Sequence, residues 1–419
     1  MIDILNDLKE RELIYQTTNL EELQKRLSKG KIVLYCGFDP TGESLHLGNF
    51  LHLIALKRFQ MLGHQPIVVL GGATGLIGDP SGRTEERPLI SKKILEENKL
   101  KIKKQIEKFL DFKGKNKALI LDNYLWHSKQ KLLDFLREIG KNFTVSYLLA
   151  KESVKNRLET GISFTEFSYN LLQAFDFYYL FKNYNCELQI GGSDQWGNIT
   201  SGIDLIKKIE NKEVFGLTLP LITTTSGEKF GKSTGKGIWI SKNLTSPYEL
   251  YQFLFNTPDS EVIKLLKYFT FLSLSQIEKL EKELKNQPEK REAQRVLAFE
   301  MVKIIHSEKE AKEAEKISKA LFYGNIKDLT EKELEIATKD LPTFVLENTL
   351  KISLLDLLVL AKISLSKREA RQDILNGIIF INDIKYDKLD SEIKKSLCLF
   401  KKYLIIRKGK KNYYLVLWK

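Results

Sequence analysis

The chain has 419 residues, which is too long for one compact core, so we expect two or three domains. Its 42% hydrophobic and 29% charged residues are typical of a soluble globular protein, and no apolar run approaches the roughly 20 residues of a membrane-spanning helix. Three distant cysteines and five scattered histidines argue against a disulfide framework, a zinc site or another metal cluster. The first eleven residues lack the apolar centre of a signal peptide, so we expect a cytoplasmic protein with no membrane partner.

The net charge of +13 comes from 67 Lys and Arg against 54 Asp and Glu. Residues 353–419 alone contain 15 basic and 7 acidic residues, so most of the excess charge lies in this last sixth of the chain. Lysines spread over solvated helix faces would not be concentrated in this way. Nucleic acid is therefore the favoured partner of this segment.

The order of predicted elements indicates an α/β fold. Residues 1–30 have a helical leucine pattern, and short apolar runs typical of buried strands follow at 32–34, 67–70, 118–122 and 188–190. Helical stretches separate these runs, which predicts a Rossmann-like, doubly wound parallel sheet. In such sheets ligands bind beyond the carboxyl ends of the strands.

The turn from Tyr35 to Asn49 connects the first strand to a helix that should start near Gly48. Its glycines let the backbone approach a ligand, and the helix start directs unpaired N–H groups and a positive dipole end into the turn. His46 and Asn49 add side-chain donors there. The turn therefore predicts a phosphate site, although an ordinary glycine-rich connection with a solvated histidine could have the same sequence.

Three polar residues, Tyr169, Gln173 and Asp176, have the spacing of one helix face. Large apolar residues flank them, so burying this face would be costly without a ligand to satisfy the polar groups. An exposed polar stripe is the alternative. We interpret the face as part of a binding site.

Two loops carry further candidates. Gly191 to Asn198 follows the last strand, and its paired glycines and Asp194 suit a close approach to a ribose. Another loop contains Asp79 with Arg83 and Arg87. A surface turn could contain similar residue types but would seldom need adjacent glycines directly after a buried strand.

Lys229 and Lys232 lie three residues apart in a polar, glycine-punctuated stretch, which we interpret as a mobile loop whose ammonium groups can follow phosphate. A solvated basic loop is the simpler reading of this motif alone. The expected organisation is a Rossmann-like domain at 1–222, the lysine loop at 223–237, a helical domain at 238–323, a linker at 324–351 and a small α+β domain at 352–419.

Taken together, these motifs resemble the bacterial tyrosyl-tRNA synthetases, a family of class I aminoacyl-tRNA synthetases. His46-Leu47-Gly48-Asn49 is similar to the first class signature, usually His-Ile-Gly-His, and Lys229 to Ser233 is similar to the second, usually Lys-Met-Ser-Lys-Ser. The stretches Tyr35–Thr41 and Gly191–Asn198 are characteristic of the tyrosine enzymes. The likeness extends over the whole chain, with Asn49 and Phe230-Gly231 as departures from the signatures.

The resemblance implies a role for each motif. The phenolic hydroxyl of tyrosine would be held by Tyr35 and Asp176, and its ammonium group by Asp79, Tyr169 and Gln173. The adenosine and ribose of ATP would lie along Cys36, Gly192, Asp194 and Gln195. The triphosphate would contact His46, Asn49, Lys229, Lys232, Arg83 and Arg87, and the remaining expected ATP contacts are Gly37, Asp39, Thr41, Gly48 and Ser233.

The family reaction joins tyrosine to ATP, releases pyrophosphate and then passes tyrosine to the terminal ribose of tRNA(Tyr). The resemblance thus implies ATP as a substrate accompanied by Mg²⁺, no tightly bound cofactor and a homodimer. The first step needs no protein nucleophile, because positioning and cations beside the pyrophosphate supply the catalysis. Cys36 is accordingly expected to be a contact residue.

The segment from Leu365 to Asp383 resembles a small RNA-binding module shared by a ribosomal small-subunit protein and pseudouridine synthases. Lys367, Arg368 and Arg371 would begin a helix there and bind the RNA backbone by charge and shape. A solvated basic face is the alternative.

Two rival functions stay open at this point. The first is tryptophan charging on the same scaffold, which the phenol-seeking pair Tyr35 and Asp176 disfavours. The second is a non-catalytic RNA-binding protein, which the intact His46, Lys229 and Lys232 disfavour. Tyrosine-dependent exchange between ATP and pyrophosphate would separate the three.

Overall fold

The computed structural model describes residues 3–82, 85, 87–155, 157–158, 161–222, 237–323, 326–339, 341–347, 349–409 and 412–419. The chain forms two compact units. One consists of Met1–Ser246 with Thr257–Leu297, and the other of Pro247–Asn256 with Ala298–Lys419. Among the helices in these ranges, none is long and apolar enough to span a bilayer.

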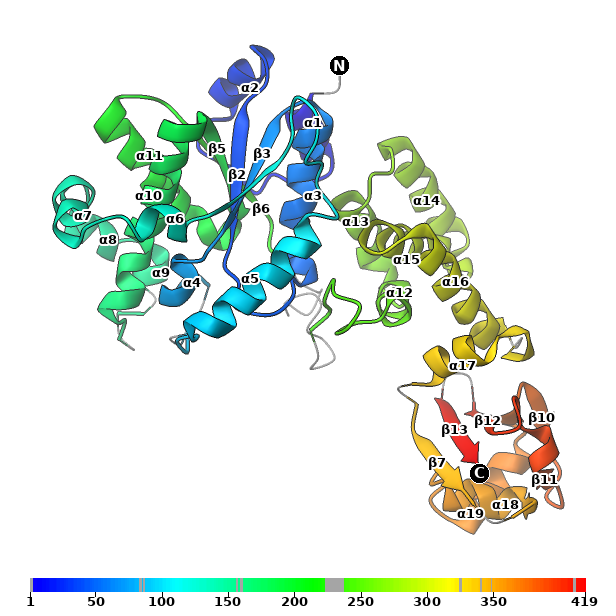
Figure 1. The fold of residues 1–419 in the computed structure, drawn as a ribbon. Coiled ribbons are helices and arrows are strands. Elements are labelled where there is room, and N and C mark those ends of the chain that lie inside the picture. Colours follow the sequence, from blue (N-terminus) through cyan, green and yellow to red (C-terminus); the bar gives the residue numbers. More distant parts are fainter. Residues whose placement is uncertain are drawn as a thin grey trace. The chain divides into compact units, whose positions relative to one another are not determined.

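The first unit contains a six-stranded sheet with the order β1-β6-β5-β2-β3-β4 (Figure 1). Its strands are β1 (Gln16–Thr17), β2 (Val33–Phe38), β3 (Gln65–Leu70), β4 (Leu119–Asp122), β5 (Cys186–Gly192) and β6 (Phe215–Leu219). All are parallel except the short edge strand β1. The expected doubly wound α/β fold is confirmed, and β2 to β5 are the four strands predicted from the sequence.

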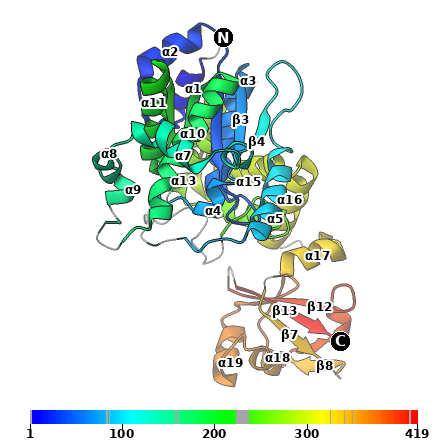
Figure 2. The same cartoon turned by 60° about the vertical axis from the view of Figure 1, so that its left-hand side comes forward.

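Helices cover both faces of this sheet (Figures 1 and 2). The helices of this unit are α1 (Ile4–Glu10), α2 (Leu20–Ser28), α3 (Leu47–Met61), α4 (Thr74–Ile77), α5 (Lys92–Ile106), α6 (Tyr124–His127), α7 (Leu132–Glu138), α8 (Val145–Leu149), α9 (Glu152–Lys155), α10 (Phe164–Tyr184), α11 (Trp196–Glu210), α13 (Asp259–Phe269) and α14 (Leu274–Asn286). Side chains alternate across each strand, so Tyr35, Ile67 and Val69 share the core that includes Phe177 of α10. α3 packs against β2, β3 and β5.

The strand order places a topological switch point between β2 and β5. β3 and β4 follow on one side of β2, whereas β5 and β6 lie on its other side. Connections therefore leave the carboxyl ends of β2 and β5 in opposite directions, which opens a crevice between them. The turn after Phe38 and the turn after Gly192 both lie at this crevice.

Helices α13 and α14 belong to the unit that contains the large sheet. Arg11 and Arg58 share the carboxylate of Asp7, and both guanidinium groups donate to main-chain carbonyls at or just beyond the end of α13. The last carbonyls of a helix have no partner within the helix, so these buried arginines fix α13 to α1 and α3. We expected residues 238–323 to form one helical domain. Instead, 238–246 and 257–297 belong to the first unit, and 247–256 and 298–323 belong to the second.

The second unit combines helices with a five-stranded sheet of order β10-β9-β12-β13-β7 and the two-stranded sheet β11-β8. The helices are α12 (Pro247–Phe255), the end of α15 (Glu292–Ile305), α16 (Glu308–Tyr323), α17 (Glu331–Thr338), α18 (Leu354–Leu360) and α19 (Lys367–Leu375). The strands are β7 (Thr343–Leu346), β8 (Lys351–Ser353), β9 (Ile379–Ile381), β10 (Ile384–Tyr386), β11 (Glu392–Lys394), β12 (Tyr403–Lys408) and β13 (Asn412–Trp418).

Both faces of the five-stranded sheet are covered. Leu404, Ile406 and Val416 pack with α18 and α19, while Tyr403 and Ile405 pack with α16 and α17. Strand β7 pairs with β13 in parallel. The expected linker at 324–351 therefore contains a helix and an integral strand. The strand was not predicted because only one side chain of β7 is fully buried, so the segment lacks the apolar run of a core strand.

Candidate active site

His46 is the N-cap of α3, and it forms a reciprocal capping box with Asn49. The Nδ1 atom of His46 accepts from the Asn49 N–H at 3.1 Å, and Oδ1 of Asn49 accepts from the His46 N–H at 3.4 Å. A side chain at Gly48 could not fit, since a Cβ there would lie 2.9 Å from Cε1 of His46. The predicted helix start near Gly48 is therefore confirmed, and the side chain of Asn49 caps this helix.

The segment that follows the lysine motif runs beside His46. The Ile240 N–H donates to the Leu45 carbonyl at 3.0 Å, and the rings of Trp239 and His46 are 6.3 Å apart. Lys229, Lys232 and Ser233 lie outside the described residues, as does Arg83. The described chain resumes at Gly237, and Trp239 and Ile240 lie directly beside the His46 turn.

Tyr35, on β2, and Asp176, on α10, are both buried. The hydroxyl of Tyr35 is buried and has no hydrogen-bond partner, and burial together with the nearby Asp176 carboxylate raises its pKa. Asp176 accepts from Trp126 Nε1 at 2.7 Å, from His127 Nε2 at 2.8 Å and from Asn123 Nδ2 at 3.0 Å. Oδ2 of Asp176 has one acceptor position left, so the pair can bind a hydroxyl that both donates and accepts.

Asp79, Gln173 and Gln195 meet around Asn198. The Nδ2 atom of Asn198 lies 3.0 Å from Gln173 Oε1 and 3.2 Å from Gln195 Oε1, and Gln195 Nε2 donates to Asp79 Oδ2 at 2.6 Å. Asp79 also accepts from the Ser81 N–H at 3.0 Å. These acceptor oxygens converge from α10, from the 3-10 turn Ser193–Gln195 before α11 and from the loop after α4, as a site for an ammonium group requires.

A chain of hydrogen bonds joins Tyr169 to Asp176. The Tyr169 hydroxyl donates to Asp39 Oδ2 at 2.8 Å, Thr74 donates to Asp39 Oδ1 at 2.7 Å, and Asn123 donates to Thr74 at 2.9 Å and also to Asp176. Burial raises the pKa of Asp39 to about 6. Asp39, expected as an ATP contact, thus also supports Tyr169.

The turns after β2 and β5 form the remaining side of the crevice. Burial raises the pKa of the Cys36 thiol to about 12, so this cysteine is not an activated nucleophile. A Cβ at Gly192 would lie 2.6 Å from Asp194 Oδ1 and 3.5 Å from His52 Nε2, so glycine keeps space between these side chains. At Gly37 a Cβ would meet nothing within 4 Å, and the Thr41 N–H closes a tight turn onto the Asp39 carbonyl at 2.8 Å.

Sequence reasoning missed several residues of this site. They are Thr74, Asn123, Trp126, His127, Asn198, His52 and Trp239. Asn198 stood inside a motif that we had singled out, and Asn123 directly follows a predicted strand, so position relative to the sheet could have indicated both. The others carry no local signal, because only tertiary packing brings them to the crevice.

Comparison with known proteins gives the family. The model for tRNA synthetases class I (W and Y) matches residues 27–323, and the model for the tyrosine–tRNA ligase SYY-like C-terminal domain matches residues 333–416. Tyrosine–tRNA ligase 1 of Bacillus subtilis (strain 168) is 49% identical over 422 residues, which is 100% of either chain. The chain belongs to the class I tyrosyl-tRNA synthetases. The tyrosine–tRNA ligase of Bacillus caldotenax is 50% identical over 417 residues, 99% of each chain.

The fold agrees with that membership. A crystal structure of a C-terminally truncated mitochondrial tyrosyl-tRNA synthetase from Aspergillus nidulans superimposes with a TM-score of 0.71 at 33% identity. The match covers 77% of this chain and 95% of that one. The family is therefore supported by both sequence and structure.

In the second unit, α19 begins at Lys367 as predicted and is followed by the strand β9. Lys367 pairs with Asp356 at 2.8 Å. Arg368 and Arg371 are exposed one helical turn apart and have no partner among the residues whose positions are given. These two arginines are the better candidates for contact with a polyanion.

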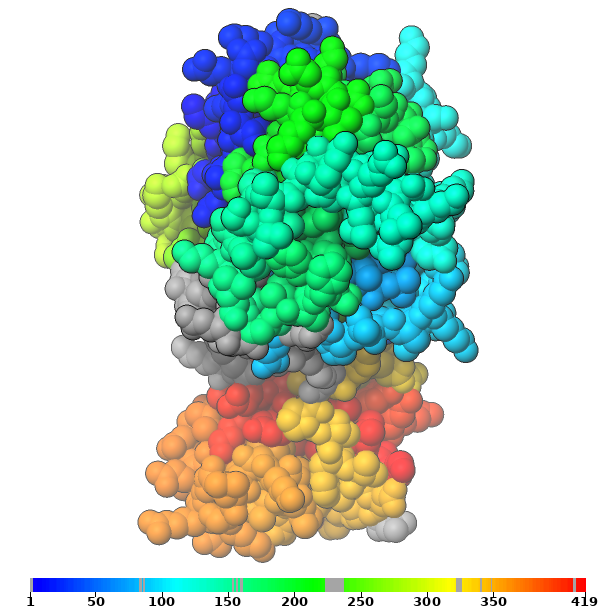
Figure 3. Space-filling view, turned by 90° about the vertical axis from the view of Figure 1, so that its left-hand side faces the viewer, coloured from blue at the N-terminus to red at the C-terminus, as the bar shows by residue number. Residues whose placement is uncertain are grey.

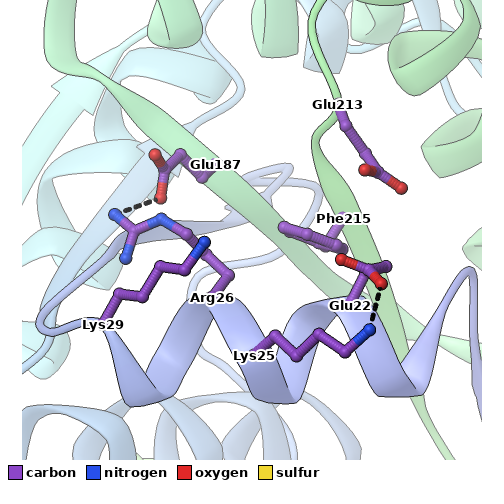
Figure 4. A pocket seen from close by; sticks show the side chains of 7 residues that line it. All are labelled: Glu22, Lys25, Arg26, Lys29, Glu187, Glu213 and Phe215. Atoms are coloured by element: carbon purple, nitrogen blue, oxygen red, sulfur yellow. Dashed lines mark hydrogen bonds and ion pairs between the residues drawn. The ribbon is translucent and has the colours of Figure 1, made fainter.

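A separate hollow of about 190 Å³ lies between α2 and the first residues of β5 and β6 (Figure 4). Arg26 pairs with Glu187 and Lys25 with Glu22, each at 2.7 Å, so much of its charge is neutralised internally. It lies at the amino ends of the strands, opposite the crevice. We assign it no part in the chemistry.

Proposed function

We propose that this protein activates L-tyrosine with ATP to tyrosyl-adenylate and pyrophosphate and then transfers tyrosine to the terminal ribose of tRNA(Tyr). The observation that carries the proposal is the orphaned hydroxyl of Tyr35 beside Asp176. A phenol would accept from Tyr35 and donate to the remaining lone pair of Asp176 Oδ2. Phenylalanine would leave both groups unpaired, which disfavours its binding.

The ammonium group of tyrosine would then be bound by Asp79, Tyr169 and Gln173. The side-chain oxygens of Asp79 and Gln173 already accept from the amide of Asn198, and the Tyr169 hydroxyl already donates to Asp39. These side chains are therefore held in place without a ligand. Little reorganisation accompanies binding, which favours affinity. The substrate carboxylate is left at the crevice between β2 and β5.

ATP, accompanied by Mg²⁺, would lie across this crevice. Cys36, Gly37, Gly192, Asp194 and Gln195 would line the adenosine and ribose. The phosphates would meet the start of α3 at Gly48, together with His46, Asn49, Thr41, Arg83, Arg87, Lys229, Lys232 and Ser233. The tyrosine carboxylate attacks the α-phosphorus, and these donors stabilise the charge that develops on pyrophosphate.

Tyrosine-dependent exchange of pyrophosphate into ATP tests the first step. We expect exchange with tyrosine, and with tryptophan or phenylalanine only at much lower efficiency. Exchange with tryptophan in place of tyrosine would support the rival substrate, and no exchange with any amino acid would leave only an RNA-binding role. Charging of tRNA(Tyr) in the same preparation tests the second step.

We further propose that residues 1–222 and the lysine loop at 223–237 activate tyrosine, that residues 238–323 face the anticodon side of the tRNA, and that 352–419 bind RNA through Lys367, Arg368 and Arg371. Deleting 353–419 should abolish tRNA charging while exchange persists. Charged tRNA is consumed by translation in the cytoplasm, so we propose that the protein is cytoplasmic.

We also propose a homodimer. Exposed apolar side chains gather on α6 to α8 and at the start of α10, on the face that Figure 3 shows. Leu133 is 77% and Phe164 78% exposed, and an apolar patch of this kind is typical of a protein interface. Leu133→Asp should shift the sedimenting species toward the monomer, whereas Leu100→Asp, on α5, should not. An unchanged mass for Leu133→Asp would contradict this interface.

A further inference from the structure

A buried ion pair between Arg157 and Glu166 has no part in the substrate contacts described above. Glu166 is 1% exposed and Arg157 is 3% exposed. The Nη2 atom of Arg157 lies 3.1 Å from Glu166 Oε2. Burying two charged groups is costly, and two apolar side chains of similar volume could fill the same space at lower cost. The presence of a charged pair here therefore calls for an explanation other than stability.

The second carboxylate oxygen of Glu166 supplies a link to the active site. Oε1 accepts from the main-chain N–H of Arg87 at 3.4 Å. Glu166 lies in the first turn of α10, and the main-chain N–H of Glu166 donates to the hydroxyl of Ser163 at 3.2 Å. A carboxylate in that turn is favoured by the helix dipole, so Glu166 is a fixed acceptor for the incoming Arg87 segment.

Arg87 is held at two points. Besides its main-chain contact, its Nε donates to the Asp79 carbonyl at 3.2 Å. Its stem crosses Gly78, which has a φ of +91° and where a Cβ would lie 3.2 Å from the Arg87 Cβ. Nη1 and Nη2 of Arg87 bond to no residue that the structure describes. A guanidinium held by Nε presents these two groups as a fork that matches two phosphate oxygens.

We propose that Glu166 is a positioning residue for tyrosine activation. With Arg157 as its counter-ion it fixes the main chain of Arg87, so that the Nη groups of Arg87 meet the phosphates of ATP. The inference rests on the phosphate role of Arg87 proposed above. It assigns Glu166 no contact with either substrate.

A double-mutant cycle tests the proposal with the full chain. We expect Glu166→Ala and Arg87→Ala each to lower the turnover of tyrosine-dependent exchange about 10–100-fold, with the KM for tyrosine within twofold of the parent. Because Glu166 acts through Arg87, the double variant should be no slower than Arg87→Ala alone. Losses that multiply would overturn the proposal.

A second comparison avoids an unpaired buried charge. In an Arg157→Met background, Glu166→Gln keeps an oxygen for the Arg87 N–H, whereas Glu166→Leu does not, and both remove the two charges. We expect the Gln variant to exchange faster at a similar melting temperature, and equal rates would overturn the proposal. If Arg87→Ala leaves exchange unchanged, the phosphate role of Arg87 fails as well. If Arg87→Ala is slow but no Glu166 variant is, only the positioning role fails.

Discussion

His46 and Asn49 hydrogen-bond to each other across the first turn of α3, each through its side chain to the other's main-chain N–H. Because Nδ1 of His46 accepts a hydrogen bond, the proton of the neutral ring resides on Nε2. The ring is thereby set as a donor. The tautomer of His46 is thus coupled to the start of the helix through the main-chain N–H of residue 49, while the Asn49 side chain caps the His46 N–H.

Asn49→Ala should therefore affect both stability and ATP binding. Losing half of the capping box should lower the free energy of unfolding by about 1 kcal/mol, measured by urea denaturation. The KM for ATP should rise while that for tyrosine stays unchanged. Asn49→Asp is the matched variant, since it keeps the acceptor oxygen and the cap but adds a negative charge beside the triphosphate. We expect it to retain stability and still lose exchange activity. Equal loss of stability in both variants would contradict the capping role.

Lys232→Ala should slow adenylate formation by about 100-fold, because an ammonium group that meets charge developing on pyrophosphate acts mainly in the transition state. The dissociation constant of tyrosine should barely change. Rapid-quench measurement of adenylate, with equilibrium dialysis for tyrosine, checks both statements. Lys212→Ala, an exposed lysine before β6, is the control. Collapse of tyrosine binding with intact turnover would show that the lysine segment has another role.

Tyrosine affinity should depend on pH through Asp39. Burial raises the pKa of Asp39 to about 6 in the folded protein, against 3.8 ordinarily. The folded state therefore holds this proton more tightly than the unfolded state, and the contribution to stability, about 3 kcal/mol, is lost as pH rises from 4 to 6. The Tyr169 hydroxyl faces the ammonium group with its oxygen because it donates its proton to the ionised carboxylate of Asp39. If this arrangement is required, tyrosine should bind roughly tenfold more weakly one pH unit below that pKa. Titration calorimetry between pH 5 and 7.5 checks this. Asp39→Asn should give a flat profile, and a flat profile in the parent protein would contradict it.

Arg371→Glu should raise the KM for tRNA(Tyr) several-fold and leave tyrosine-dependent exchange unchanged. The logarithmic salt dependence of tRNA binding should become shallower by about one ion, as expected when a phosphate contact is removed. Lys113→Glu, which reverses an exposed charge in the first unit, is the control. If both variants weaken tRNA binding equally, general charge and not the α19 surface determines affinity.

The sequence was most informative where the physical signal is local. The apolar runs of β2 to β5 predict strands by themselves, and the spacing of Tyr169, Gln173 and Asp176 predicts one face of α10. The helix start at His46 is readable from its glycines. Each of these predictions depends on fewer than ten consecutive residues.

The missed features depend on distant segments. Asn123 supports Asp176 only because β4 lies at the edge of the sheet beside α10, and Thr74 joins them from a third segment. Residues 1–30 were predicted as helical throughout, yet β1 interrupts them because Gln16 and Thr17 find a partner in β6. β7 escaped notice because its pairing partner, β13, is about 70 residues away in the chain. Such contacts leave no trace in local periodicity.

The hydrogen-bonded path from Tyr169 through Asp39, Thr74 and Asn123 to Asp176 has a consequence for protein engineering. The groups that recognise the two ends of the amino acid share partners, so their energetic effects will not be independent. Recoding the enzyme for a para-substituted phenylalanine by changing Tyr35 and Asp176 alone would disturb recognition of the amino group. A successful library would vary Asn123 and Thr74 at the same time.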